Sequence, residues 1–123
     1  MYIGFNNNPE GKAVGDCVVR AISKALGLHW EDAYIALVTE GYKHHDMPSS
    51  NYVWGMLLYD HGFDRRMPAC SRCFTVEEFT RENPEGIFVI ATDSHVVTAI
   101  DGDYFDSWDS GDKIVNYFWH KEE

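Results

Sequence analysis

The apolar positions in the first half of the chain recur every three or four residues, which is the spacing of amphipathic helices. The predicted helices cover residues 17–26, 28–38 and 51–59, and they end at Gly27, Gly41 and Gly62. The positions expected to face the core are Val18, Ala21, Ile22 and Ala25, then Trp30, Tyr34, Leu37 and Val38, then Val53, Trp54, Leu57 and Leu58.

The apolar period changes from helical to alternating after residue 86. Just before it, Thr75 and Glu78 form a capping box, which predicts a short helix over residues 76–82. Predicted strands cover residues 87–91, 95–100, 104–108 and 114–119, and residues 1–14 and 63–74 are expected to be irregular, with at most a short strand at the N-terminus. Helices followed by a meander indicate an α+β fold, with N-terminal helices packed on a C-terminal antiparallel sheet.

Length and composition agree with one domain over residues 1–123. The chain has 123 residues, of which 45% are hydrophobic, and this is enough apolar material for a single core. No apolar run is long enough to span a bilayer, and the N-terminus does not resemble a signal sequence. We therefore expect no membrane partner and a cytoplasmic location, in the host cell if the protein is encoded by a phage.

The net charge of −10 narrows the possible partners. Proteins that bind nucleic acid neutralise phosphates with Lys and Arg, so this charge argues against a nucleic-acid partner. The plainest interpretation is that the charge keeps a small domain in solution. The alternatives are a cationic partner or substrate, or a protein that mimics an acidic surface.

Cys17 is the residue that first suggests chemistry. Gly15 and Asp16, a turn former and a helix cap, precede it, so Cys17 is expected in the first helical turn, where the positive end of the helix dipole favours a thiolate. Three cysteines are an odd number in a chain with no signal sequence, and this favours free thiols. Cys70 and Cys73 form a lone Cys-x-x-Cys without a second ligand pair, so both are expected to be incidental.

A thiolate nucleophile needs a base, and a histidine base needs a group that orients it. Among six histidines, His95 opens a predicted strand directly after a turn, where a side chain can face a cleft. Counting through the two-residue turn at 101–102 sets Asp106 diagonally across from His95 on the same sheet face. Asp106 is therefore the expected orienting acid. A one-residue slip would favour Asp93, Asp101 or Asp109 instead.

The chain resembles the papain-like cysteine peptidases, in particular small uncharacterised members carried by bacteria and their phages. The matching stretches are residues 15–22 (GDCVVRAI), 30–34 (WEDAY), 94–97 (SHVV), 101–102 (DG) and 104–111 (YFDSWDSG), so the resemblance covers nearly the whole chain. It implies a helix-borne nucleophile, Cys17, packed against a sheet that supplies His95 as general base and acid and Asp106 as the orienting residue. Papain-like enzymes usually place a Gln shortly before the cysteine for the oxyanion hole, and this chain contains no Gln.

Asn8 and Asn6 are the side chains that are expected to replace that Gln, with the backbone N–H groups of Asp16 and Cys17 as the alternative. The resulting hypothesis is a cysteine hydrolase, a peptidase or isopeptidase with a peptide or protein substrate. The second hypothesis is a weak or inactive papain-like scaffold that binds a host or defence protein through its acidic surface. Neither hypothesis calls for a metal or another cofactor: His44, His45 and Asp46 are adjacent residues of an expected solvated loop. The oligomeric state is not predicted.

Overall fold

The computed structural model describes residues 1–68 and 74–122, and in this part of the chain it contains four helices and a six-stranded sheet. The helices are α1 (Cys17–Leu26), α2 (Trp30–His44), α3 (Asn51–Asp60) and α4 (Val76–Glu82). The strands are β1 (Tyr2–Gly4), β2 (Asp64–Arg66), β3 (Ile87–Ala91), β4 (Val96–Ile100), β5 (Asp103–Asp106) and β6 (Tyr117–Lys121). The chain is an α+β protein, as its apolar pattern predicts.

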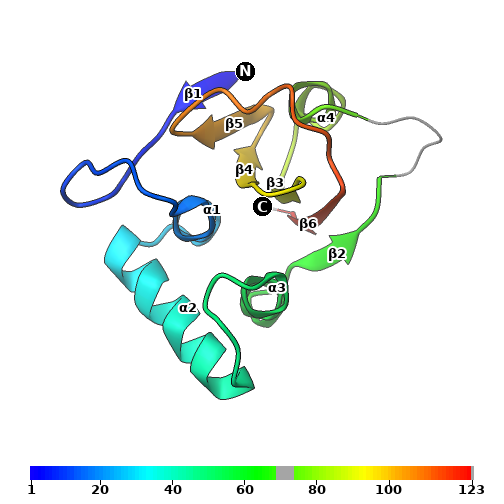
Figure 1. Ribbon diagram of the computed structural model, residues 1–123. Helices are drawn as coiled ribbons and strands as arrows, with labels where there is room; N and C mark the ends of the chain where they lie inside the picture. The colour runs from blue at the N-terminus through cyan, green and yellow to red at the C-terminus, as the bar shows by residue number, and fades with distance from the viewer. Residues whose placement is uncertain (69–73, 123) are drawn as a thin grey trace.

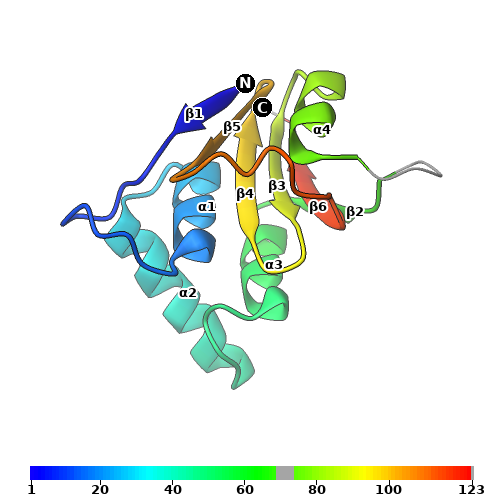
Figure 2. The same ribbon diagram turned by 45° about the horizontal axis from the view of Figure 1, so that its top comes forward.

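The sheet is covered on both faces (Figures 1 and 2). Helices α1 and α3 lie on one face with α2 outside them, and α4 lies on the other. Side chains that alternate along β3 divide between two cores, so that Val89 packs with α1 to α3 while Phe88 packs with Phe79 of α4. Burial on both faces explains why residues 87–91 form a continuous apolar run.

The sheet is mixed, which corrects the prediction of an antiparallel sheet. Its strand order is β1-β5-β4-β3-β6-β2, and β1 pairs in parallel with β5 while the other neighbours are antiparallel. The third and fourth strands of the predicted meander are not neighbours, because β6 returns to pair with β3. Strand β2 lies in a region expected to be irregular. Strand β6 begins at Tyr117, three residues after the predicted start, and Ile114 instead forms a separate bridge with Thr75.

Helix α1 has the predicted bounds, and Gly27 ends it in the left-handed conformation, with φ of 68°. The buried hydroxyl of Thr98 on β4 donates a 2.7 Å hydrogen bond to the carbonyl of Ala21, in the middle of this helix. Because that bond and the apolar contacts of Ile22 fix α1 on β4, the first turn of the helix comes to the end of the sheet where β4 starts.

Helix α2 differs from the prediction at its C-terminal end and on its outer face. It continues through Gly41 to His44, and a Cβ at Gly41 would lie 2.8 Å from the carbonyl oxygen of Asp46, so this glycine serves a close approach inside the helix. Leu37 is buried as predicted, but Tyr34 and Val38 are 47% and 39% exposed. The predicted core stripe of α2 is therefore partly a surface.

The remaining helices follow the prediction. Ser50 caps α3 by accepting a hydrogen bond from the Val53 N–H, and the capping box of Thr75 and Glu78 is formed at the start of α4. No helix within the described residues is long and apolar enough to cross a membrane.

Candidate active site

A cavity of about 870 Å³ opens between the first turn of α1, the exposed side of α2, the loop after α2 and the turn between β3 and β4. Cys17 and His95 both line it. Trp30, Tyr34 and Val38 supply an apolar wall from α2, with the Trp30 and Tyr34 rings stacked at a centroid distance of 5.2 Å. The side chains that depart from the predicted core of α2 thus face the cavity that holds the thiol.

Cys17 is the first residue of α1 and is half-buried. Burial by itself raises the pKa of its thiol, but the hydrogen bond with His95, a backbone hydrogen bond from Val96 and the charges of His95 and Arg20 together lower that pKa below the ordinary value of 9.0. The hydrogen bonds and the two charges therefore favour the thiolate, which is the nucleophilic form.

His95 is held by the turn that leads into β4. Its carbonyl accepts hydrogen bonds from the Thr92 N–H at 2.9 Å and the Thr92 hydroxyl at 3.0 Å. Its ring lies against Trp108, with centroids 4.6 Å apart, and only 11% of the side chain is exposed. Burial lowers the pKa of His95, but the hydrogen bonds and charges of Asp106 and Cys17 outweigh this effect and raise it to about 9.

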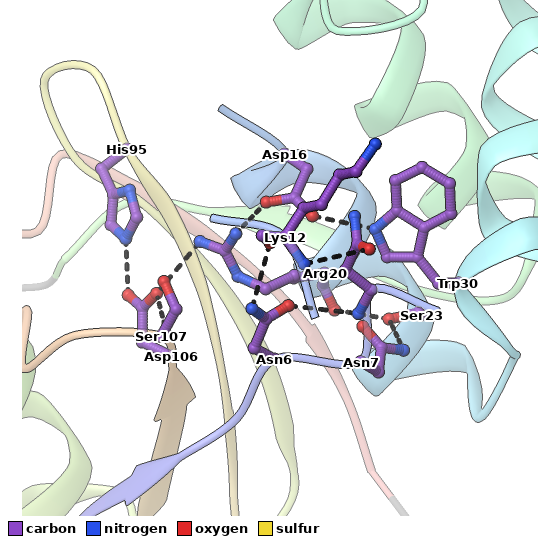
Figure 3. Close-up of polar contacts among 11 residues, drawn as sticks. Asn6, Asn7, Lys12, Asp16, Arg20, Ser23, Trp30, His95, Asp106 and Ser107 are labelled. Atoms are coloured by element: carbon purple, nitrogen blue, oxygen red, sulfur yellow. Dashed lines mark hydrogen bonds and ion pairs between the residues drawn. The ribbon is translucent and has the colours of Figure 1, made fainter. Parts of the chain in front are cut away.

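Asp106 ends β5 and is 1% exposed. Figure 3 shows its carboxylate facing the His95 ring. Its Oδ2 accepts hydrogen bonds from His95 Nε2 at 2.5 Å and from the Ser110 hydroxyl at 2.6 Å. Its Oδ1 accepts from the Ser107 N–H at 2.8 Å and from Arg20 Nη2 at 3.3 Å. Burial raises the pKa of the Asp106 carboxyl, but the bonds from His95, Ser110 and Ser107 bring it below its usual 3.8. The group facing His95 is thus a carboxylate with four donors.

The three predicted residues therefore come together as thiol, imidazole and carboxylate. Because His95 uses Nε2 for Asp106, the nitrogen left for Cys17 is Nδ1. Asp106 on Nε2 favours a proton there in the neutral ring, and Nδ1 is then the acceptor for the proton of the thiol.

The other acids considered for the orienting position have different partners. Asp93 accepts a 2.8 Å hydrogen bond from the Asn116 amide, and Asp101 accepts one of 3.0 Å from the Gly86 N–H. Asp109 accepts a 2.6 Å bond from the Tyr104 hydroxyl, and this bond lowers the pKa of Asp109. Burial, and then the bond with Asp109, raise the pKa of Tyr104. None of these three bonds involves His95.

Asn6 and Asn8 lie in the N-terminal arm, and neither is among the residues that line the cavity. The Asn6 amide donates to the Lys12 carbonyl at 3.2 Å, and the Asn8 side-chain oxygen accepts from the N–H groups of Glu10 and Lys12. Both side chains are used to shape the loop before α1. The structure thus does not bring the two expected oxyanion donors to Cys17, and Figure 3 shows Asn6 beside Lys12.

Asp16 occupies the N-cap position of α1, but its side chain makes no capping hydrogen bond, which corrects the prediction of a capping aspartate. Its Oδ1 pairs with Arg20 Nη1, and its Oδ2 accepts a 2.9 Å bond from Trp30 Nε1. Arg20, one turn further along α1, and Trp30, at the start of α2, bind the Asp16 carboxylate in place of the helix N–H groups. The first-turn N–H groups beside Cys17 therefore have no side-chain cap.

Arg20, Ser110 and Trp108 are parts of the site that the sequence did not single out. The spacing of Asp16 and Arg20, at i and i+4 of a predicted helix, is the one feature of the sequence that indicates their ion pair. The contact of Arg20 with Asp106 and that of Trp108 with His95 join segments far apart in sequence, so only the folded chain reveals them.

Residues 1–68 and 74–122 contain no group of three or more His, Cys, Asp or Glu side chains that could hold a metal ion. His44 is the last residue of α2 and bonds to Glu40 at 2.8 Å, while His45 follows it in the left-handed conformation. The predictions for Cys70 and Cys73 lie outside the described residues.

Comparisons of the chain with protein families, with curated proteins and with solved structures find no match.

Proposed function

We propose that the protein is a cysteine hydrolase of the papain-like type, a peptidase or isopeptidase. The observation that carries the proposal is the His95 imidazole, hydrogen-bonded to the buried Asp106 carboxylate, in the same cavity of about 870 Å³ that Cys17 lines. The proximity of His95 lowers the pKa of the Cys17 thiol. The helix-borne cysteine packed on a sheet that supplies His and Asp agrees with the arrangement that the resemblance implies.

The chemistry assigns one role to each group. Cys17 attacks the substrate carbonyl as the thiolate, and the proton it has given to His95 passes to the leaving amine as the carbon–nitrogen bond breaks. Water then attacks the thioester, gives a proton to His95 and releases the carboxylic acid, and the thiol is restored. Asp106 orients the imidazole and stabilises its cationic form in both steps.

The oxyanion needs donors close to Cys17, and Asn6 and Asn8 are engaged in the loop. The uncapped first turn of α1 offers backbone N–H groups at the cavity, since Cys17, Val18 and Val19 all line it. Preorganised N–H donors at the positive end of a helix stabilise developing negative charge. We propose that these groups replace the missing Gln.

The apolar wall of the cavity indicates which substrates fit beside the thiol. Trp30, Tyr34 and Val38 present apolar surface to whatever lies beside the thiol, so the acyl group that fits best carries a bulky apolar side chain. A peptide or protein substrate supplies such a group. A thiol nucleophile also has to stay reduced, which favours action in the cytoplasm.

Trapping of the acyl-enzyme tests this function. Wild type and Cys17→Ala protein are each incubated with p-nitrophenyl esters of acetate and of N-acylated phenylalanine, quenched in acid and analysed by intact mass and peptide mapping. We expect acylation at Cys17 in the wild type alone, faster with the phenylalanine ester, and release of the acid on incubation at neutral pH. A folded wild type that never acylates at Cys17 would contradict the proposal.

One observation favours the second candidate, a protein-binding scaffold. Ile35 and Tyr42 on the outer side of α2 are 62% and 81% exposed and do not line the cavity. Exposed apolar side chains of this size are a frequent component of protein interfaces. Binding of a partner that survives Cys17→Ala but is lost in Tyr42→Asp would favour this candidate.

A further inference from the structure

Arg20 is a buried cation that joins two buried carboxylates. Its side chain is 7% exposed, and the side chains of Asp16 and Asp106 are 5% and 2% exposed. Nη1 pairs with Asp16 Oδ1, while Nη2 lies 3.3 Å from Asp106 Oδ1 (Figure 3). The planar fork of a guanidinium can address two acceptors at once, which a lysine ammonium on its flexible stem does less well.

Each of the two carboxylates adjoins a different part of the proposed site. Asp106 is the group that bonds His95, and Asp16 directly precedes Cys17. A buried ion pair contributes little to stability as such, because the desolvation of its charges offsets their attraction. The place of Arg20 between these two acids therefore calls for an explanation other than stability.

We infer that Arg20 is a positioning residue of the Cys17 site, which holds the Asp106 carboxylate in place for His95 and keeps the Asp16 carboxylate off the first turn of α1. As a statement about a reaction, the inference rests on the proposed hydrolase function. As a statement about geometry, it concerns only the thiol, the imidazole and the helix end.

The first effect concerns Asp106. Arg20 and the Ser107 N–H occupy Oδ1, so Oδ2 is the oxygen left to face His95. With this arrangement the carboxylate cannot rotate without breaking a charge-assisted hydrogen bond. The guanidinium also lowers the pKa of the Cys17 thiol through its charge.

The second effect concerns Asp16. An aspartate at the N-cap normally accepts a hydrogen bond from an N–H group two or three positions into the helix, here Val18 or Val19. Arg20 and Trp30 hold both oxygens of Asp16 instead. The first-turn N–H groups are consequently left for a ligand in the cavity.

The test compares Arg20→Met with wild type and with Lys24→Met. Lys24 is a matched control because it lies one turn further along α1, where its ammonium is 4.2 Å from the Phe105 ring centroid and outside the site. Alkylation of Cys17 by iodoacetamide is followed across pH by mass spectrometry, and exchange of the Val18 and Val19 amide hydrogens is followed by NMR.

For Arg20→Met we expect the alkylation midpoint to move to higher pH and the rate at pH 7 to fall several-fold, because the cation near Cys17 is lost. We also expect the Val18 or Val19 amide to exchange more slowly, because the released Asp16 carboxylate caps the helix. Lys24→Met should change neither quantity. A folded Arg20→Met protein with the wild-type midpoint and wild-type exchange would overturn the inference.

Arg20→Lys answers the question if Arg20→Met does not fold. It keeps the charge but loses the fork, so the alkylation midpoint should stay near the wild-type value while the His95 ring resonances shift as Asp106 loses its fixed position. Unchanged ring resonances would overturn the inference. None of these measurements requires turnover, so a protein that shows these effects without hydrolysing any ester refutes the proposed function and keeps the positioning role.

Discussion

His95 Nε2 and Asp106 Oδ2 lie 2.5 Å apart on neighbouring segments of one hairpin. The register of that hairpin pairs Ile100 with Asp103 across a two-residue turn, in which Asp101 and Gly102 both have positive φ, 51° and 88°. This is the turn that matches the twist of paired strands. Because the turn fixes the register, it also fixes which carboxylate meets the imidazole.

Replacement of Asp106 by Ala should lower hydrolysis by about 10²–10⁴-fold, less than Cys17→Ala, because an orienting group takes no part in bond making. The pKa of His95 should fall below its value of about 9, since the largest interaction that raises it is removed. NMR titration of the ring in both proteins measures this shift. An unchanged pKa would assign Asp106 to the turn at 107–111 and leave a Cys–His pair.

The Cys17→Ala protein should also show a lower pKa for His95, since the thiol raises that pKa by a hydrogen bond and by charge. Asp106 still holds it above the ordinary 6.5. The stabilisation from His95 should therefore be present in full below pH 6.5 and be lost as the pH rises through the folded-state value. Urea unfolding of Cys17→Ala across this range checks the sign, and stability that increases with pH there would contradict it.

Hydrolysis should depend on two ionisations. The rate should rise with pH through a value below 9.0, where the Cys17 thiolate forms, and fall as the pH passes about 9, where His95 loses the proton for the leaving amine. Initial rates of ester or peptide cleavage across pH measure both limbs. A rate that keeps rising beyond pH 10 would indicate an ordinary thiol that acts without His95.

Much of the site could be derived from sequence because its parts depend on local rules. The bounds of α1 follow from its apolar spacing and from Gly27, so Cys17 could be placed in a first turn. The contact between His95 and Asp106 follows from counting through a hairpin whose turn residues set the register.

What the sequence did not provide depends on contacts between distant segments. Strand β1 pairs in parallel with β5 across about a hundred residues, and no local pattern encodes such a partner. Asp16 does not cap α1 in part because its carboxylate accepts a hydrogen bond from Trp30, which belongs to another helix. The sequence predicts a buried stripe on the exposed side of α2, because apolar residues that line a cavity recur with the same helical period as residues that face the core.

The turn that holds Ser110 should be sensitive to Gly111→Ala. A Cβ at this position would overlap the Tyr104 hydroxyl, and Tyr104 is 1% exposed, so its ring has little room to move aside. We expect the free energy of unfolding to fall by about 1–3 kcal/mol and the His95 titration to change, because Ser110 and Asp106 are bonded. Gly4→Ala is the control, since its nearest contact is 3.7 Å away. Equal urea midpoints for the two variants would contradict the described turn.

The rates at which the three cysteines react with iodoacetamide test whether Cys17 is a poised nucleophile. The folded protein is alkylated at pH 7, samples are quenched over time, and peptide mapping gives a rate constant for each of Cys17, Cys70 and Cys73, with His95→Ala as the comparison. We expect Cys17 to react fastest in the wild type and to lose this advantage in His95→Ala, because the hydrogen bond and charge that lower the thiol pKa are gone. Equal rate constants for the three thiols in the folded wild type, or a Cys17 rate that His95→Ala leaves unchanged, would contradict this expectation.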